Sequence, residues 1–331
     1  MNYIGSKYRL SNFILTTVKS VVGEDLSDKI FCDIFAGTGI VGRTFKPLVK
    51  KVITNDLELY SYVLNKNYIE NHEELIFEEF IAELNEIQGV DGFISSEYSE
   101  NGLGNRMYFS KENGRKIDAV RQRIEEWKIC NRINENQFYF LLCSLLESAD
   151  KVANTASVYG AFLKRIKKSA QKEMIIEPAM FLLNENSHEV YNEDANSLIK
   201  KLKGDILYLD PPYNARQYGA NYHLLNTIAE YKTFLPKGKT GLRNYSKSKY
   251  CSKDLVHKEF ENLIKNAEFK YVFFSYNNEG LMAIEDVRKI MGKYGNYDLA
   301  EIDYQRFKAD KTENHNHKAE KTTEYLHILV K

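Results

Sequence analysis

An acid, two prolines and a tyrosine directly follow an apolar run of the chain. Residues 205–214 read DILYLDPPYN, which places Asp210, Pro211, Pro212 and Tyr213 at the end of the run. Two consecutive prolines cannot continue a strand ladder or enter the interior of a helix, so they stiffen the backbone where the expected strand stops. The sequence therefore predicts a rigid turn that holds the carboxylate of Asp210 and the ring of Tyr213 in a fixed relation.

These residue types suit methyl transfer to the amino group of adenine. The amino nitrogen has its lone pair delocalised into the ring, and hydrogen-bond acceptors must draw it toward tetrahedral geometry. Asp210 supplies one acceptor, the Pro211 carbonyl supplies a second, and Tyr213 can stack on the base. An activated methyl donor needs no metal or covalent intermediate, and a duplex adenine must flip out to reach such a pocket. The alternative is a structural Pro-Pro turn with a surface tyrosine.

A glycine loop follows the first apolar run. The run IFCDIF at 30–35 leads into GTGIVG at 37–42, and glycines at the carboxyl end of a strand allow positive φ and close approach of a ligand. Asp56 follows the next run, KVIT at 51–54, where an acid can bind ribose hydroxyls. By itself this loop fits either NAD or S-adenosylmethionine, so an NAD-dependent oxidoreductase stays open at this point.

The apolar runs predict an α/β fold built on a Rossmann-like, mostly parallel sheet. Beyond the first two runs, strands are expected at 205–210, 270–276, 297–304 and 324–330, with helical or loop segments between most of them. The last two strands are joined by a polar loop without a helix, which predicts an antiparallel final strand.

Residues 66–186 are expected to form an inserted, mainly helical target-recognition domain. Within them, 71–100 holds nine acids and no Lys or Arg, and 111–150 reads as amphipathic helices. The catalytic domain would then be discontinuous, comprising 1–65 and 187–331.

Composition bounds the class of protein. The 331 residues hold 46 basic and 46 acidic side chains, so only local patches can argue for a nucleic-acid partner. The cysteines are far apart without a CxxC pair, which predicts reduced packing residues; they are Cys32, Cys130, Cys143 and Cys251. No signal peptide and no apolar run long enough to span a bilayer is apparent, so we expect a soluble, cytoplasmic protein without a membrane partner.

The order of these motifs resembles that of the alpha-group, Dam-like adenine-specific DNA methyltransferases, over nearly the whole chain. That family carries a cofactor lid, a glycine loop, a target-recognition region and then DPPY. The strings at 105–118 and 149–164 look most like the NlaIII-like subgroup, which modifies the adenine of CATG. The resemblance implies an S-adenosylmethionine-dependent methyltransferase sheet, base flipping of duplex DNA and a restriction-modification system.

The resemblance also implies the cofactor site. NYIGSK at 2–7 matches the motif over the methionine end of the cofactor, FAGTG at 35–39 the cofactor loop, and TNDLE at 54–58 the ribose acid. NEDANSL at 192–198 stands where the family carries a polar residue near the cofactor adenine, the alternative being a helix N-cap by Asp194. The implied residues are Tyr3, Gly5, Lys7, Asp33, Phe35, Ala36, Gly37, Thr38, Gly39, Asp56, Leu57, Asp194, Ala195 and Asp210. FFSYNNEG at 273–280 is expected to place Ser275 and Tyr276 in the pocket wall.

Two basic tracts are expected to bind DNA. Residues 151–172 and 232–250 each hold six basic residues and no acid, as phosphate binding requires; a solvated charged face is the alternative for each. Tyr245 and Tyr250 are interleaved in the second tract, and the acidic stretch 71–100 should face away from DNA. The expected DNA-binding residues are Asn154, Ser157, Tyr159, Lys164, Arg165, Lys167, Lys168, Arg216, Tyr218, Lys237, Lys239, Arg243 and Lys247.

The sequence also gives expectations about metal binding, alternative classes of protein and protein partners. His315 and His317 form an HxH pair without a third ligand nearby, so no metal is expected and a mobile loop near DNA is preferred. A methyltransferase acting on RNA or protein and a DNA-binding module without catalysis stay as alternatives, although Asp rather than Asn at position 210 favours DNA adenine. We expect a monomer or weak dimer, and a cognate restriction endonuclease that acts on the same site without direct contact.

Overall fold

The fold is described from a computed structural model, for residues 6–305 and 321–331. The chain divides into two compact units, each with its own hydrophobic core. The α/β unit comprises Ser6–Leu57, Asn184–Gln217 and Ser246–Lys331. The helical unit comprises Glu58–Leu183 and Tyr218–Tyr245.

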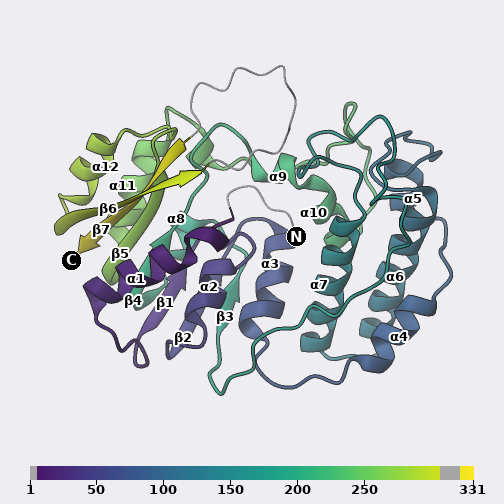
Figure 1. The fold of residues 1–331 in the computed structure, drawn as a ribbon, viewed down its shortest axis with the longest axis horizontal. Coiled ribbons are helices and arrows are strands. Elements are labelled where there is room, and N and C mark those ends of the chain that lie inside the picture. The colour runs from purple at the N-terminus through teal and green to yellow at the C-terminus, as the bar shows by residue number, and fades with distance from the viewer. Residues whose placement is uncertain (1–5, 306–320) are drawn as a thin grey trace. The chain divides into compact units, whose positions relative to one another are not determined.

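Seven strands form one sheet in the α/β unit, in the order β3-β2-β1-β4-β5-β7-β6 (Figure 1). They are β1 (Ile30–Asp33), β2 (Lys51–Asn55), β3 (Glu189–Tyr191), β4 (Lys203–Leu209), β5 (Glu268–Asn277), β6 (Asn296–Gln305) and β7 (Lys321–Val330). The pairs from β3 to β5 are parallel, whereas β7 is antiparallel to both β5 and β6. This confirms the expected methyltransferase-type sheet with its antiparallel final strand.

The edge strand β3 was not predicted from the sequence. It has only three residues, all of them half-buried, so no apolar run marks it. It pairs with β2 in parallel, with Tyr191 opposite Asn55, and the imidazole Nδ1 of His188 accepts a hydrogen bond from Val52 N at 3.1 Å just before the strand begins. The pairing leads the chain from the sheet edge to Asp194.

Both faces of the sheet are covered by helices. On one face, Phe31 stacks on Phe45 of α2 with ring centroids 4.1 Å apart. On the other, Phe274 packs on Phe260 of α11 at 4.3 Å. Each strand can bury side chains on both faces because its successive residues point to opposite faces of the sheet. The helices of this unit are η1 (Tyr8–Leu10), α1 (Ser11–Val22), α2 (Ile40–Phe45), α8 (Ala195–Leu198), η3 (Lys249–Cys251), α11 (Val256–Asn266) and α12 (Ile284–Met291).

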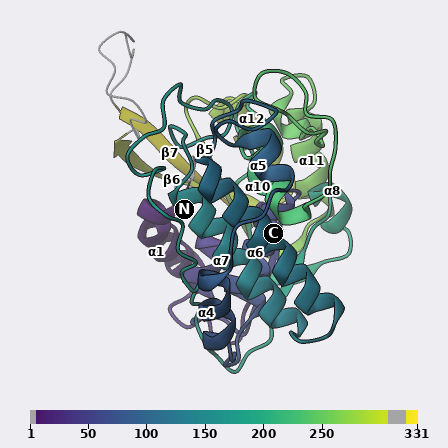
Figure 2. The same ribbon diagram turned by 90° about the vertical axis from the view of Figure 1, so that its right-hand side faces the viewer.

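The helical unit is organised around α7. Its helices are α3 (Leu59–Asn65), the π-helical turn η2 (Lys66–Glu70), α4 (Glu78–Glu86), α5 (Phe93–Tyr98), α6 (Lys111–Ile129), α7 (Glu135–Lys151), α9 (Tyr218–Asn221) and α10 (His223–Glu230). α6 and α7 lie side by side (Figures 1 and 2). Ser144 and Ser148 of α7 accept hydrogen bonds from Ala179 N at 3.0 Å and Glu177 N at 3.1 Å, so they fix an extended segment along this helix.

Residues 218–245, which follow the Asp210–Tyr213 turn in sequence, also belong to the helical unit. Leu224, Leu225 and Ile228 of α10 are fully buried in the same core as Tyr60 of α3. The compact unit is therefore assembled from two chain segments, whereas the expected target-recognition domain at 66–186 is one segment. The expected boundaries remain a prediction about where target recognition resides.

The cysteines and helices add two observations. All four cysteines are free thiols; Cys32, Cys143 and Cys251 are buried, as expected for packing residues, while Cys130 is exposed. Across residues 6–305 and 321–331, no helix is both long and apolar enough to cross a membrane.

Candidate active site

The Asp210–Tyr213 turn begins where β4 ends. Leu209 is the last residue of β4, which lies between β1 and β5, and Tyr208 is in register with Asp33 of β1. The carboxyl ends of these parallel strands meet at one edge of the sheet, so Asp210 and Asp33 lie close enough for their charges to interact. This edge is where open α/β sheets bind ligands.

Lys7 holds the carboxylate of Asp210. Its Nζ lies 3.0 Å from Asp210 Oδ1, and the two side chains are only 5% and 18% exposed. Burial raises the pKa of Asp210, and the neighbouring ammonium opposes that rise. Burial alone would lower the pKa of Lys7, but the surrounding carboxylates outweigh it and raise that pKa. The ion pair fixes one carboxylate oxygen, so the other can accept a hydrogen bond from a bound amine.

Tyr213 is positioned by the segment after β5. Its carbonyl accepts a hydrogen bond from Leu281 N at 3.0 Å, and its ring meets that of Tyr276 edge-on, with centroids 6.2 Å apart. Tyr276 is in turn fixed because Met282 N donates to its hydroxyl at 3.3 Å. A Cβ on Gly280 would lie 2.0 Å from the Tyr276 ring, which explains the glycine. Tyr276 therefore lies beside the turn, and Ser275 before it is buried; their place in a pocket wall remains a prediction.

The glycine loop is tied to Asp56. Gly37 and Gly39 have φ of +52° and +74°, a conformation that favours glycine. Gly37 N donates to Asp56 Oδ2 at 2.8 Å, and Ala36 N donates to Asn55 O at 2.9 Å. The loop after β1 and the acid after β2 are therefore held together as one cradle. Of the neighbouring candidates, Thr38 is half-buried and Leu57 is exposed.

Asp33 presents a buried acceptor beside this cradle. The residue is 1% exposed, and its Oδ1 has no hydrogen-bond partner among the described residues. Burial, together with the charge of Asp210, raises the pKa of Asp33 well above the ordinary value. Because a buried acceptor without a partner is costly, this oxygen suits a ligand that brings a hydrogen-bond donor.

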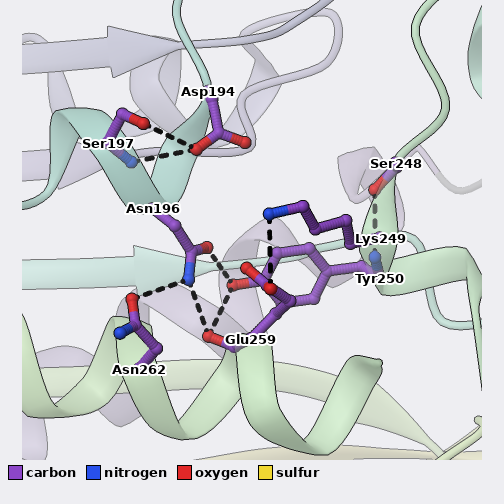
Figure 3. Close-up of polar contacts among 8 residues, drawn as sticks. All are labelled: Asp194, Asn196, Ser197, Ser248, Lys249, Tyr250, Glu259 and Asn262. Atoms are coloured by element: carbon purple, nitrogen blue, oxygen red, sulfur yellow. Dashed lines mark hydrogen bonds and ion pairs between the residues drawn. The ribbon is translucent and has the colours of Figure 1, made fainter. Parts of the chain in front are cut away.

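Figure 3 shows the polar contacts of Asp194 and Tyr250, and the Tyr250 ring contacts Phe35 of the same loop. Asp194 caps α8, since its Oδ1 accepts hydrogen bonds from both Ser197 N and Ser197 Oγ at 3.0 Å. The Tyr250 hydroxyl donates to Asn196 Oδ1 at 2.8 Å, and the Tyr250 ring meets Phe35 edge-on at 5.0 Å. The N-cap interpretation of Asp194 is confirmed; a contact with cofactor remains a prediction for Asp194 and the buried Ala195.

The sequence placed Tyr250 in the second basic tract and assigned it no packing role. In the structure it is 5% exposed and belongs to the core of the α/β unit. Asn196, the partner of its hydroxyl, is itself held in place: Asn196 Nδ2 donates to Glu259 O at 2.8 Å and to Asn262 Oδ1 at 3.2 Å (Figure 3). No sequence signal distinguished this tyrosine, because its burial depends on contacts with residues more than fifty positions away.

Two expected base-reading residues point inward. Asn154 is fully buried: its Nδ2 donates to Met107 O and Leu163 O, and its Oδ1 accepts from Lys167 N. Tyr159 is also fully buried, and its hydroxyl donates to Asp150 Oδ1 at 2.8 Å. The polar atoms of both side chains form hydrogen bonds inside the helical unit, so these residues fix the conformation of the loop between them. This corrects the expectation that both present side chains to DNA.

The basic DNA candidates fall into two groups, apart from Tyr218 and Ser157. Those whose side chains are exposed are Lys164, Arg165, Lys168, Arg216, Lys237, Lys239 and Lys247. Those held by other groups are Lys167, which donates to Thr155 O, and Arg243, which pairs with Glu230. Lys237 also donates to Asn244 Oδ1 at 2.8 Å. Tyr218 begins α9 and stacks on Tyr222, and Ser157 has φ of +87°, a strained value for serine.

Some expected residues lie outside the described part of the chain. They are Tyr3 and Gly5 of the cofactor motif and the pair His315 and His317. Within the described ranges, no group of three or more His, Cys, Asp or Glu side chains is arranged to hold a metal ion.

Comparisons with known proteins agree with this geometry. A family profile described as D12 class N6 adenine-specific DNA methyltransferase matches residues 3–290. The chain is 61% identical over 332 residues to the type II methyltransferase M.NlaIII of Neisseria lactamica, covering 100% of this chain and 99% of that protein. It is 38% identical to M.CviAII of Paramecium bursaria Chlorella virus 1 over 93% of both chains. It is also 38% identical to M.FokI of Planomicrobium okeanokoites, covering 100% of this chain and 53% of that protein.

The chain therefore belongs to the D12 class N6 adenine-specific DNA methyltransferase family. The expected resemblance to adenine-specific DNA methyltransferases is confirmed, and the NAD-dependent oxidoreductase suggested by the glycine loop is set aside. Among solved structures, a magnesium protoporphyrin IX methyltransferase of Synechocystis PCC 6803 with bound SAM has 10% identity and a TM-score of 0.36, over 98% of this chain and 79% of that one. Similarity at that level says nothing about function.

The contact between Tyr250 and Phe35 leads to a prediction about the cofactor. Tyr250→Phe removes the hydroxyl that holds Asn196, so the Phe35 side of the cradle should loosen and the affinity for S-adenosylmethionine should fall about threefold to fivefold. Isothermal calorimetry on the folded protein measures this change. Tyr245→Phe, the matched loss of a hydroxyl in the same tract, should leave the affinity unchanged. Equal affinities for the two variants would show that Tyr250 does not shape the cradle.

Proposed function

We propose that this protein transfers a methyl group from S-adenosylmethionine to the N6 amino group of a flipped adenine in duplex DNA, with Asp210–Tyr213 as the catalytic turn. The observation that carries this proposal is the Asp210 carboxylate, which stands after a strand end in a proline-stiffened turn and is held by the buried Lys7. A merely structural turn would not need a buried ion pair at its acid.

The cofactor fits the residues of the cradle. Gly37 and Gly39 allow close approach of a ligand, Asp56 stands at the ribose position of this loop, and the unpartnered Asp33 Oδ1 suits the ammonium of the methionine moiety. Phe35, backed by Tyr250, offers an aromatic wall for the adenine ring. When bound, S-adenosylmethionine supplies an electrophilic methyl group on a sulfonium, which keeps the electron pair of the broken carbon–sulfur bond.

The catalytic turn prepares the acceptor nitrogen. Asp210 and the Pro211 carbonyl accept hydrogen bonds from the two amino protons, which frees the nitrogen lone pair for the new bond. Tyr213, fixed edge-on by Tyr276, stacks on the base and sets its plane. After transfer, the surplus amino proton leaves to the Asp210 carboxylate and then to solvent. An adenine within a duplex must leave the base stack to reach Asp210.

The exposed basic side chains support a DNA surface on each tract. Lys164, Arg165 and Lys168 are exposed on the first tract, and Lys239 and Lys247 on the second. Arg216 is exposed directly after the catalytic turn, where it can contact a phosphate of the target strand. The loop pinned by the buried Asn154 and Tyr159 is our candidate for base recognition, with Ser157 as its reader.

The biological setting follows from the relatives. The 61% identity to a protein named a type II methyltransferase supports a restriction-modification role, with a cognate endonuclease that acts on the same site. The likeness of 105–118 and 149–164 to the NlaIII-like subgroup supports CATG as the target. A DNA substrate and four free thiols support a cytoplasmic location. We propose a monomer or weak dimer that needs no metal.

The role of Asp210 can be tested directly. Asp210→Ala removes the acceptor for the amino group, so the rate of methylation of duplex DNA should fall at least 100-fold to 1000-fold, whereas the affinity for S-adenosylmethionine should change little. Single-turnover assays with labelled methyl donor give the rate. Asp28→Ala, which truncates an exposed aspartate, serves as the control. Near-normal turnover of Asp210→Ala would refute the proposed mechanism.

The role of the first basic tract predicts a change in salt dependence. Replacing Lys164 and Lys168 by Gln should flatten the plot of log affinity against log salt by about 0.9 for each phosphate that is no longer neutralised. The matched pair Lys203→Gln and Lys270→Gln, at the amino-terminal ends of β4 and β5, should leave the slope unchanged. Fluorescence anisotropy with a DNA duplex measures both slopes. Identical slopes for the two double variants would place DNA away from this tract.

A further inference from the structure

Glu324 of β7 reaches the catalytic turn from a strand that none of the recognised motifs includes. It is in register with Asn277 at the end of β5, so antiparallel pairing brings it to the sheet edge that carries Asp210. The residue is 8% exposed, and its Oε2 is buried without a hydrogen-bond partner among the described residues. The nearest cation to this oxygen is Lys7 Nζ, at 4.0 Å.

Lys7 therefore stands between two carboxylates. It is 3.0 Å from Asp210 Oδ1 and 4.0 Å from Glu324 Oε2, so the acceptor pair is joined to a second acid. Asp33 is another acid near Asp210, and burial raises the pKa of Asp33 and that of Glu324 alike. When Asp210 and Glu324 are both ionised, one ammonium faces two carboxylates, and the group Lys7, Asp210 and Glu324 carries one net negative charge.

Burying a net charge lowers the stability of the folded protein, so such a group is expected to serve the function of the site. Positive charge moves onto the adenine nitrogen as the methyl group arrives, and a fixed negative group beside it stabilises that change. Lys7 and Asp210 alone would form a neutral pair, whose ammonium opposes positive charge on the bound amine. Glu324 supplies the missing negative charge.

We propose that Glu324 is a positioning residue for methyl transfer: it shares the Lys7 ammonium with Asp210 and so keeps Asp210 a strong acceptor for the adenine amino group. The proposal rests on the proposed role of Asp210. The side chain of Asn277, which hydrogen-bonds Glu324, and the buried Tyr208 and Tyr213 are the other groups that face this cluster.

The titration of the cluster gives a readout that a structural role would not move. Burial and the charge of Asp210 raise the pKa of Glu324, and burial raises that of Asp210, while the Lys7 ammonium opposes both rises. The coupling of two neighbouring acids is reciprocal, so an ionised Glu324 should in turn oppose ionisation of Asp210. Catalysis requires Asp210 as a carboxylate, so its rate falls as the pH drops through the pKa of the coupled group. Removal of the Glu324 charge should shift this acid limb to lower pH, although the plateau rate also falls.

The experiment compares Glu324→Gln with Glu301→Gln, an exposed glutamate of β6 paired with Tyr325. Single-turnover methylation of duplex DNA is measured from about pH 5 to about pH 9, an interval chosen to include the expected limb. For Glu324→Gln we expect a plateau about tenfold lower and an acid limb shifted down by roughly one pH unit. Glu301→Gln should match the parent, and Glu324→Asp, which keeps the charge, should retain the parent acid limb.

A second readout needs no bound cofactor. Carboxyl ¹³C NMR of labelled aspartate, with Asp210→Asn assigning the resonance, should show Asp210 titrating at lower pH in Glu324→Gln than in the parent. An unshifted Asp210 titration, or a lower plateau with an unmoved acid limb, would overturn the proposal. The Asp210→Ala variant separates the two levels: if it methylates DNA normally, the catalytic assignment fails, whereas an inactive Asp210→Ala beside a parent-like Glu324→Gln rejects only the role of Glu324.

Discussion

The structure of the candidate active site depends on a buried ion pair between Lys7 and Asp210. Neither charge is stable alone at this depth, because burial penalises an isolated ion far more than a solvated one. Lys7 precedes the first helix, and Asp210 follows the fourth strand, so the ion pair joins the start of the α/β unit to its sheet. The proline-stiffened turn and the acid are therefore held from two directions.

Parallel strand order collects the other functional groups around this pair. Asp33 ends β1, Asp56 follows β2 and Asp210 follows β4. These parallel strands are neighbours, so their carboxyl ends lie side by side at the same end of the sheet. The antiparallel β7 then adds Glu324 from the opposite chain direction. Several acids thus share one ammonium within the described part of the site, which makes the protonation of each depend on the others.

In the helical unit, buried polar residues stabilise the conformation of a loop. Asn154 and Tyr159 satisfy backbone and side-chain partners in the interior, and this holds the short loop between them in shape. Buried hydrogen bonds of this kind fix a conformation because leaving any partner unpaired is costly. The loop that carries the strained Ser157, our candidate for base recognition, therefore stands on a rigid base.

The sequence by itself determined the sheet class, the Asp210–Tyr213 turn and the glycine loop with Asp56, because local runs, prolines and glycines limit the backbone directly. It did not predict β3, whose three half-buried residues carry no periodic signal. It placed Tyr159 toward DNA and assigned no packing role to Tyr250, since a basic neighbourhood in sequence does not reveal which way a ring points. Only tertiary structure decided their burial, the meeting of Lys7 with Asp210 and the approach of Glu324, because each depends on partners distant in the chain.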